Sequence, residues 1–383
     1  MRFADIDLDA LVANLRRVRE LTAAGQLIAV VKADAYGHGA VAVSRTAVAA
    51  GADTLGVADV IEAIELRAAG IEAPILAWLH GSETDLLAAV ELGITLGVSD
   101  RTTLERIVAA ARTLQRVARV HLEADTGLNR AGARAEQWGE LVRTARQAEA
   151  AGAIAVDGVW SHLANVSAEH NRVQAERFQA ALGLARAEGL SPRLTHLASS
   201  EGALTEPELR CDAVRPGITL YGLTPTWAEE PASVWGLRPV MSLRSEVVLV
   251  SDLSAGGGVS YGHDWIAPTA TRVALVPFGY ADGLPRSASG RAEVAIGGVR
   301  YPVRGRIAMD QIVVEIGDAP VALGDQVTLW GDPASGAPSA DEWAAWAGTI
   351  GYELVTKVGR RVRYRYHGGA VAGSTGDGIG AEA

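Results

Sequence analysis

The sequence is poor in cysteine and contains no long apolar run. Its single cysteine, Cys211, cannot form an internal disulfide and argues against a redox pair or a zinc cluster, which agrees with a reducing compartment. No apolar stretch reaches the roughly 18 residues needed to span a bilayer. The first residues, MRFADIDLDALVANLRR, interleave charges with apolar residues where a signal peptide would have an uninterrupted apolar block. We therefore expect a globular protein of the cytoplasm, with no membrane partner.

Positive charge is also scarce, because 35 Lys and Arg residues are outnumbered by 45 Asp and Glu residues and the net charge is −10. This balance argues against nucleic-acid partners, and no basic stripe with interleaved aromatic residues is present. Small molecules are therefore the expected partners. Lysine itself is rare: apart from Lys357, the only one is Lys32, which directly follows an apolar run in AVVKADAYGHG.

Short apolar runs alternate with amphipathic helical stretches, such as DRTTLERIVAAARTL, through the first part of the chain. Continuously apolar strands with helical crossovers indicate a parallel sheet covered on both faces. Eight such units are the number that closes a (β/α)8 barrel, whereas a doubly wound open sheet is the competing architecture. The predicted strands lie near residues 27–31, 54–58, 75–79, 94–98, 117–122, 156–161, 194–198 and 213–216.

The pattern changes after about residue 235. Short runs of branched residues separated by glycine turns, as in RAEVAIGGVRYPVRGRIAMDQIVVEIG, predict a mainly β domain. The fold class is therefore α/β: a TIM-like barrel over 8–235, then a mainly β domain over 236–368 that the N-terminal residues 1–7 join, and a disordered tail over 369–383. In the barrel domain, Asp9 is the expected N-cap of the first helix.

Chemically reactive residues follow several of the predicted barrel strands. The C-terminal strand ends of such a barrel meet at one mouth, where the chemistry takes place. A partly desolvated lysine near arginines can form a Schiff base with an aldehyde, and serine hydroxyls beside glycine-turn amides are typical of a phosphate site. An amine nucleophile beside a phosphate site suggests pyridoxal 5'-phosphate. The residues expected at the mouth are Lys32, Tyr36, Arg130, His162, Ser199, Ser200, Arg215, Gly217 and Ile218.

Ordered motifs along the chain resemble those of the bacterial alanine racemases. The motifs AVVKADAYGHG, DTGLNRAG, SHLA, VRPGITLYG, GGGVSYG, PFGYADG and GRIAMDQ occur in the order and approximate spacing of that family, from about residue 3 to residue 366. The resemblance implies an α/β barrel followed by a β domain, a head-to-tail homodimer, and pyridoxal 5'-phosphate held by Lys32. It further implies that the enzyme interconverts L- and D-alanine and so supplies D-alanine for peptidoglycan.

The resemblance also implies a two-base mechanism on substrate joined to the cofactor as a Schiff base. Lys32 would serve D-alanine, and Tyr261 of the partner subunit would serve L-alanine from the opposite face. A free tyrosine titrates near about pH 10, so Tyr261 needs support as a base: His162 would contact it and Arg215 would back the histidine. Arg215 would also donate to the pyridine nitrogen, which must then stay unprotonated because guanidinium only donates.

Binding roles follow from the same resemblance. Arg130 would lie near the phenolic oxygen of the cofactor and the substrate carboxylate, and the backbone amide of the partner's Met309 would also bind the carboxylate. We expect a narrow channel suited to a small side chain. The positions that match the phosphate contacts of the family are Tyr36, Ser200, Gly217, Ile218 and Tyr352.

One position departs from the family pattern. Many members have a lysine, modified to a carbamate, seven residues before the active-site arginine, and this chain has Glu123 there. Because glutamate is permanently charged near neutral pH, we expect Glu123 to orient Arg130 without modification.

Other functions remain open from the sequence alone. A serine-preferring or broad-specificity racemase would share every motif, and a barrel-type amino-acid decarboxylase would keep the lysine and the phosphate site. A single-barrel pyridoxal phosphate carrier would lack the second domain. A metal site is not expected, because no two histidines have a ligand-type spacing such as His-Glu-x-x-His.

Overall fold

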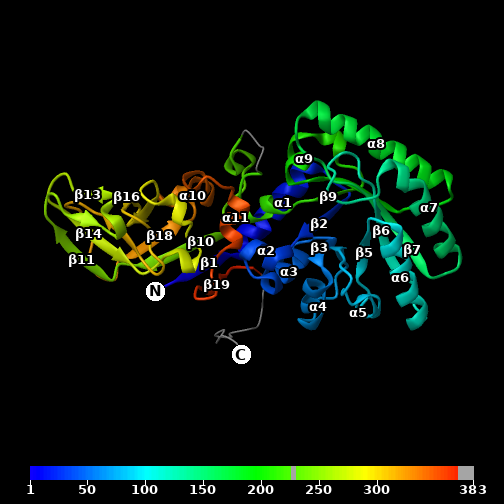
Figure 1. Ribbon diagram of the computed structural model, residues 1–383, viewed down its shortest axis with the longest axis horizontal. Helices are drawn as coiled ribbons and strands as arrows, with labels where there is room; N and C mark the ends of the chain where they lie inside the picture. The colour runs from blue at the N-terminus through cyan, green and yellow to red at the C-terminus, as the bar shows by residue number, and fades with distance from the viewer. Residues whose placement is uncertain (226–229, 370–383) are drawn as a thin grey trace.

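Eight parallel strands close into a barrel, which occupies the right-hand side of Figure 1. The computed structural model describes residues 1–225 and 230–369. Closure of the sheet confirms the predicted barrel and excludes the doubly wound open sheet. In order around the barrel, the strands are β2 (Gln26–Val30), β3 (Thr54–Asp59), β4 (Ile75–Leu79), β5 (Thr95–Val98), β6 (Ala118–Glu123), β7 (Ile154–Trp160), β8 (Leu194–Ser199) and β9 (Ala213–Arg215).

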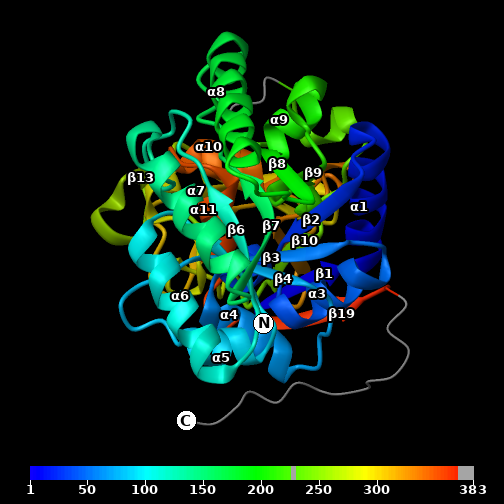
Figure 2. The same ribbon diagram turned by 90° about the vertical axis from the view of Figure 1, so that its right-hand side faces the viewer.

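Helices surround the barrel strands, as the end-on view of Figure 2 shows. The longer helices bury an apolar stripe against the sheet. In α6 (Arg101–Leu114), for example, Leu104, Ile107 and Ala111 are buried, and Asp100 caps the helix by accepting from the Thr103 N–H. Among the described residues, no helix combines the length and apolar character needed to cross a membrane. The other helices here are α1 (Leu8–Thr22), α2 (Lys32–Gly37), α3 (Ala40–Ala49), α4 (Val60–Ala68), α5 (Leu86–Glu91), α7 (Ala135–Ala150), α8 (Ala168–Ala187) and α9 (Ser200–Thr205).

The N-cap of α1 is Asp7, so the predicted cap at Asp9 is wrong. The Oδ1 atom of Asp7 accepts from the Ala10 N–H at 2.9 Å, and the helix begins at Leu8. Asp9 lies in the first turn, and its Oδ1 atom accepts from the N–H of Gly369 at 2.8 Å. Apart from Gly369, the predicted disordered tail over 369–383 lies outside the described residues.

A nine-stranded sheet forms the second part of the molecule, on the left of Figure 1. The N-terminal strand β1 belongs to this sheet, where it pairs antiparallel with β10 and parallel with β19. A hairpin of two short strands, β12 (Gly258–Val259) and β13 (Trp265–Ile266), lies at the end farthest from the barrel. In spatial order, the large sheet contains β11 (Leu249–Leu253), β14 (Thr271–Val276), β17 (Ile312–Glu315), β16 (Val299–Arg304), β15 (Glu293–Ile296), β18 (Gln326–Trp330), β10 (Met241–Glu246), β1 (Phe3–Asp7) and β19 (Arg363–His367).

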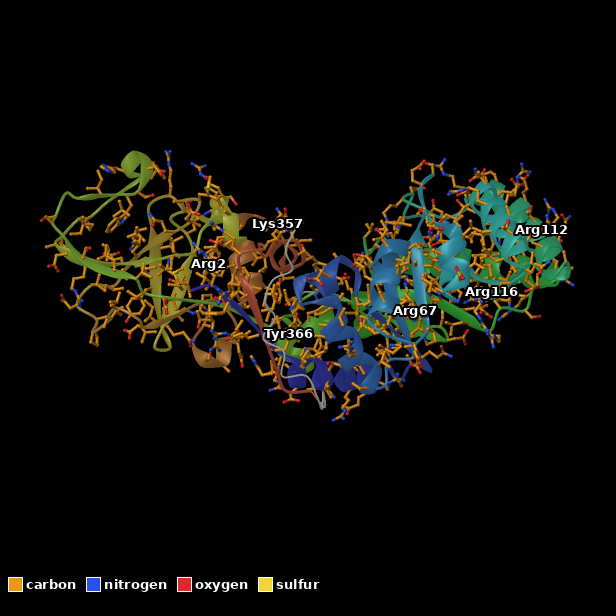
Figure 3. The ribbon with its side chains drawn as sticks, turned by 90° about the horizontal axis from the view of Figure 1, so that it is seen from below. Arg2, Arg67, Arg112, Arg116, Lys357 and Tyr366 are labelled. Atoms are coloured by element: carbon orange, nitrogen blue, oxygen red, sulfur yellow. The ribbon has the colours of Figure 1, made fainter. Side chains whose placement is uncertain are left out.

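The second part contacts the barrel through α11 (Gly351–Thr356), which packs on α2, and through β19, which packs on α1, while α10 (Ala340–Ala347) packs on α11. Figure 3 shows Tyr366 of β19 near the junction, while Arg67, Arg112 and Arg116 lie on the barrel. The hydroxyl of Tyr364, also on β19, donates to the Gly37 carbonyl of α2 at 2.9 Å. The sheet therefore supports the segment that follows β2.

That segment has an unusual left-handed backbone. Four consecutive residues, Ala33 to Tyr36, have φ between 52° and 55°. This conformation costs about 1–2 kcal/mol per residue for side chains other than glycine, so surrounding contacts must hold it. Besides the Tyr364 bond, Asp34 accepts from the Ala40 N–H at 2.6 Å, and the buried His38 ring contacts the Tyr36 carbonyl through Nδ1 at 2.9 Å. The turn fixes the positions of Lys32 and Tyr36 at the barrel mouth.

Candidate active site

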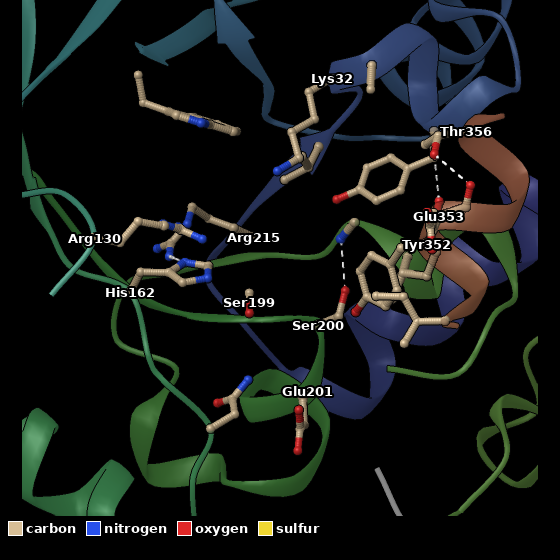
Figure 4. A pocket seen from close by; sticks show the side chains of 18 of the residues that line it. Lys32, Arg130, His162, Ser199, Ser200, Glu201, Arg215, Tyr352, Glu353 and Thr356 are labelled. Carbon is tan, nitrogen blue, oxygen red and sulfur yellow. Dashed lines mark hydrogen bonds between the residues drawn. The ribbon is translucent and has the colours of Figure 1, made fainter. Parts of the chain in front are cut away.

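A cavity of about 550 Å³ opens at the C-terminal ends of the barrel strands. Figure 4 shows Arg130, Arg215 and His162 on one side and Ser200 and Tyr352 on the other, with the Lys32 amine pointing between them. The structure thus places the strand-end residues around one space. Tyr352 reaches the same space from α11 of the second part. The sequence-predicted residues that line the cavity are Lys32, Tyr36, Arg130, His162, Ser199, Ser200, Arg215, Gly217, Ile218 and Tyr352.

Lys32 has the environment of a reactive amine. Burial lowers its pKa most, and the positive charges of Arg130 and Arg215 lower it further, while Glu62 acts in the opposite direction. Its Nζ atom lies 5.8 Å from the centre of the Trp78 ring. A larger fraction of the amine is therefore unprotonated near neutral pH than in a lysine in water, which favours nucleophilic attack and proton abstraction.

Arg215 is anchored at the wall of the cavity by four contacts. Its Nη2 atom donates to the carbonyls of Ser161 and Leu197 at 2.9 and 3.0 Å and contacts His162 Nδ1 at 3.0 Å, and its Nη1 atom contacts His196 Nδ1 at 2.9 Å. The guanidinium also lies 4.9 Å from the centre of the Trp160 ring. Burial lowers the pKa of Arg215 to about 10, so the group remains protonated near neutral pH.

The contact with Arg215 fixes the protonation of His162. Guanidinium nitrogen only donates, so His162 Nδ1 must accept and the ring proton of the neutral imidazole lies on Nε2. Burial and the nearby positive charge of Arg215 hold the pKa of His162 well below its ordinary value. At this wall of the cavity the positive charge therefore lies on Arg215, while His162 is a neutral N–H donor.

The other side of the cavity has the donors of an anion site. Ser200 Oγ accepts from the Gly217 N–H at 2.9 Å and from Thr219 Oγ1 at 3.1 Å, which leaves the Ser200 hydroxyl proton for another acceptor. Ile218 begins the short 3-10 helix η2 (Ile218–Tyr221), so its N–H has no intrahelical acceptor. The buried hydroxyl of Tyr36 lies close to Gly217, where a Cβ atom would approach it to 2.3 Å.

These features fit pyridoxal 5'-phosphate. A phosphate requires several converging donors, and the Ser200–Gly217–Ile218 turn with Tyr36 provides them. An aldehyde requires an accessible amine with a lowered pKa, which is Lys32. A pyridine nitrogen requires a donor or an acceptor, and within residues 1–225 and 230–369 the Nε–H of Arg215 has no hydrogen-bond acceptor.

Tyr261 and Met309 do not lie at this cavity. Tyr261 begins the short helix η4 (Tyr261–His263) between β12 and β13, at the far end of the second part (Figure 1). Its side chain is 73% exposed, and that of Met309 is 52% exposed, so both present large side chains to solvent. The residue before Tyr261, Ser260, has a φ of 60°, which is rare for serine. One chain therefore does not bring Tyr261 to Lys32.

Sequence reasoning missed three residues around Arg215 and Lys32. Trp78 lies under the amine, Trp160 stacks on His196 with ring centres 5.6 Å apart, and His196 contacts Arg215. Each lies in a predicted apolar strand, where a tryptophan is normally interpreted as a packing residue of the core. The histidine did carry a signal, because a polar residue inside a continuously apolar strand must have a buried partner.

Glu123 interacts with Ser99 and with the charges of two arginines. Its side chain is buried and accepts from Ser99 Oγ at 2.6 Å. Burial raises its pKa, whereas the bond from Ser99 and the positive charges of Arg215 and Arg130 oppose that shift. No ion pair between Glu123 and Arg130 is found in the part of the chain that the structure describes. Ser99 therefore holds the carboxylate, and the role of Glu123 in orienting Arg130 stays a prediction.

Nearly the whole chain is similar to alanine racemases. Residues 6–225 match the family model described as alanine racemase, N-terminal domain, and residues 240–366 match alanine racemase, C-terminal domain. The chain is 46% identical over 357 residues to the alanine racemase of Salinispora tropica, covering 92% of this chain and 95% of that protein. It is 45% identical over 368 residues to the alanine racemase of Thermobifida fusca, covering 95% and 98%. The crystal structure of alanine racemase from D-cycloserine-producing Streptomyces lavendulae has a TM-score of 0.94 and 45% identity, covering 96% of this chain and 97% of that one.

Proposed function

The chain belongs to the alanine racemase family and is an isomerase that interconverts L- and D-alanine, and we propose that it does so with pyridoxal 5'-phosphate held by Lys32. The observation that supports this cofactor most strongly is the desolvated Lys32 amine in the same cavity as the donor-rich turn of Ser200 and Gly217. The match of residues 240–366 to the second family domain disfavours a single-barrel carrier and a barrel-type decarboxylase. We also propose that the enzyme acts in the cytoplasm and supplies D-alanine for peptidoglycan.

Racemisation requires proton transfer on both faces of the α-carbon, so two bases are needed. Pyridoxal 5'-phosphate, when bound, would withdraw electrons from the substrate and acidify its α-proton. Lys32 lies in the cavity and is the base for D-alanine. The family resemblance gives Tyr261 as the base for the opposite face, and because the chain's own Tyr261 lies at the far end of the second part, it would come from the partner subunit. We therefore propose a head-to-tail homodimer with two composite sites.

The tyrosine requires stabilisation of its phenolate form in order to act as a base. With Nδ1 occupied by Arg215, His162 presents an Nε2–H donor at the cavity. We propose that this N–H donates to the phenolic oxygen of the partner's Tyr261, while the fixed positive charge of Arg215 behind the ring favours phenolate over phenol. The same guanidinium would donate from Nε to the pyridine nitrogen and leave that nitrogen unprotonated.

The substrate carboxylate would be held from both subunits. Arg130 lines the cavity, and its guanidinium suits a bidentate contact with a carboxylate. The carbonyl of Met309 accepts from the Ala281 N–H at 3.0 Å, whereas the N–H of Met309 has no acceptor within the described residues. That N–H, presented by the partner subunit on the same surface as Tyr261, would complete the carboxylate site. These contacts would fix the α-carbon between the two bases.

The experiment that tests the proposed function is incubation of the purified protein with L-alanine in D2O, followed by chiral analysis. We expect D-alanine that carries deuterium at the α-carbon, together with an absorbance band from cofactor bound to lysine. Serine serves as the competing substrate in the same assay. Release of carbon dioxide without formation of D-alanine would contradict the proposal.

Replacing Gly217 by alanine is expected to weaken cofactor binding. The added Cβ atom would lie 2.3 Å from the hydroxyl of Tyr36, whose buried ring is tilted against that of Tyr221 with the ring centres 4.9 Å apart. Displacing a hydroxyl that donates to a charged phosphate removes roughly 1.5–3 kcal/mol, so the dissociation constant should rise at least about tenfold.

The measurement is a titration of cofactor-free protein with pyridoxal 5'-phosphate, followed by absorbance. Gly183→Ala in α8 is the matched control, because a Cβ atom there would meet nothing within 4 Å. If the Gly217→Ala variant and the control bind the cofactor with equal affinity, the assignment of Tyr36 and Gly217 to the phosphate site is wrong.

A further inference from the structure

A hydrogen-bonded chain of side chains runs through the interior of the barrel. His121 Nδ1 lies 2.8 Å from His196 Nε2, and His196 Nδ1 lies 2.9 Å from Arg215 Nη1. Both histidines are buried, His196 completely. His121 lines a second cavity, formed by the N-terminal strand ends at Gln26, Thr54 and Thr95, and therefore lies on the side of His196 away from the active site.

The direction of every hydrogen bond in this chain follows from Arg215. Because guanidinium only donates, His196 Nδ1 must accept, and the neutral ring carries its proton on Nε2. That proton is donated to His121 Nδ1, which must also accept, so the proton of His121 lies on Nε2. Burial lowers the pKa of His121 to about 4 and that of His196 well below its ordinary value, so both rings are neutral near neutral pH.

The local backbone is adapted to hold the His121 ring. His121 on β6 is opposite Gly158 on β7, and the pairing register of the two strands shifts between Val120 and His121. A Cβ atom at Gly158 would lie 2.7 Å from His121 Nδ1 and 2.8 Å from other ring atoms. The ring therefore occupies space that any residue other than glycine would fill. Both the glycine and the register shift place His121 Nδ1 against His196.

We propose that His121 is a positioning residue for racemisation, which acts on Arg215 through His196. By accepting from Nε2, it stabilises the neutral tautomer of His196 that Arg215 requires, in which Nδ1 is free to accept from the guanidinium. In the other tautomer an N–H would face the N–H of Arg215, and the guanidinium would lose this anchor. The inference rests on the proposed function, because its consequence is the placement of Arg215 toward the pyridine nitrogen and His162.

Two substitutions at His121 distinguish its role as a hydrogen-bond acceptor from its role in packing. In His121→Asn, Oδ1 can occupy the place of Nδ1 and accept from His196, whereas His121→Leu fills the space without an acceptor. We expect His121→Leu to lower kcat for alanine about tenfold with little change in KM, as loss of an outer-shell partner commonly does, and to shift the cofactor absorbance band. His121→Asn should keep kcat within about threefold and leave the band in place.

The proposal is decided by which of the two variants retains the higher kcat. A purely structural role predicts that leucine, which suits an apolar interior, is tolerated at least as well as asparagine, and that result would overturn the proposal. If His121→Leu fails to fold, His121→Gln replaces it, because its amide reaches the place of Nε2 and not that of Nδ1. The wild-type holoenzyme is measured alongside: absence of racemisation there would refute the proposed function, whereas an active wild type with indistinguishable variants would refute only the role of His121.

Discussion

Alanine in place of Lys32 is expected to lower racemisation in both directions by more than about 1,000-fold. The substitution removes the amine that would hold the cofactor and, with it, the base for one face of the substrate. Because burial lowers the pKa of Lys32, an exposed amine would not have the same reactivity. The loss should appear in chiral analysis with either enantiomer as substrate, and the absorbance band of lysine-bound cofactor should disappear.

The chain provides its own control, because Lys357 is the only other lysine. It pairs with Glu353 on the surface, and Figure 3 shows it on the second part of the molecule. Lys357→Ala should retain wild-type activity. Borohydride reduction of the wild-type holoenzyme should attach the cofactor to the peptide that contains Lys32. Attachment to Lys357, or a Lys32→Ala variant that remains active, would contradict the assignment.

Phenylalanine in place of Tyr261 is expected to lower net racemisation by about 100- to 10,000-fold, the range for loss of a general base. The two faces of the substrate should respond differently. With Lys32 intact, D-alanine should still exchange its α-proton for deuterium in D2O, whereas exchange from L-alanine should nearly stop. Proton NMR of each enantiomer measures both rates directly.

Tyr301→Phe is the matched control for this substitution. Tyr301 lies on β16 in the same part of the molecule and away from the Tyr261 surface, so the loss of its hydroxyl should leave both exchange rates unchanged. If Tyr261→Phe slows exchange of D-alanine as much as that of L-alanine, Tyr261 has a structural role and a second base must be sought elsewhere.

Barrel topology explains why much of the site could be predicted from the sequence. Continuously apolar strands predict a closed parallel sheet, and its geometry requires residues at the C-terminal strand ends to meet. Lys32, Arg130 and His162 therefore reach one cavity although they are far apart in the chain. Tyr352 comes from a different part of the molecule, so only the family resemblance indicated it.

The errors and omissions have equally specific causes. Asp7 and Asp9 are both good N-caps, and the choice between them depends on where β1 ends, which is set by pairing with β10. The left-handed turn of Ala33 to Tyr36 could not be predicted, because the sequence there gives no local indication of it. Contacts from distant segments such as β19 hold the turn in place. Hydrogen-bond direction through His196 requires coordinates, since it follows from the position of a guanidinium.

The central claim is that each active site combines Lys32 of one subunit with Tyr261 of the other. The most direct test is to co-express Lys32→Ala and Tyr261→Phe chains with different affinity tags and to purify the mixed dimers. In a two-fold head-to-tail dimer, one of the two sites then contains both native residues, so we predict about half the wild-type activity. If the two residues act within one chain, both sites of the mixed dimer are defective, and activity no higher than that of the separate variants would contradict the account.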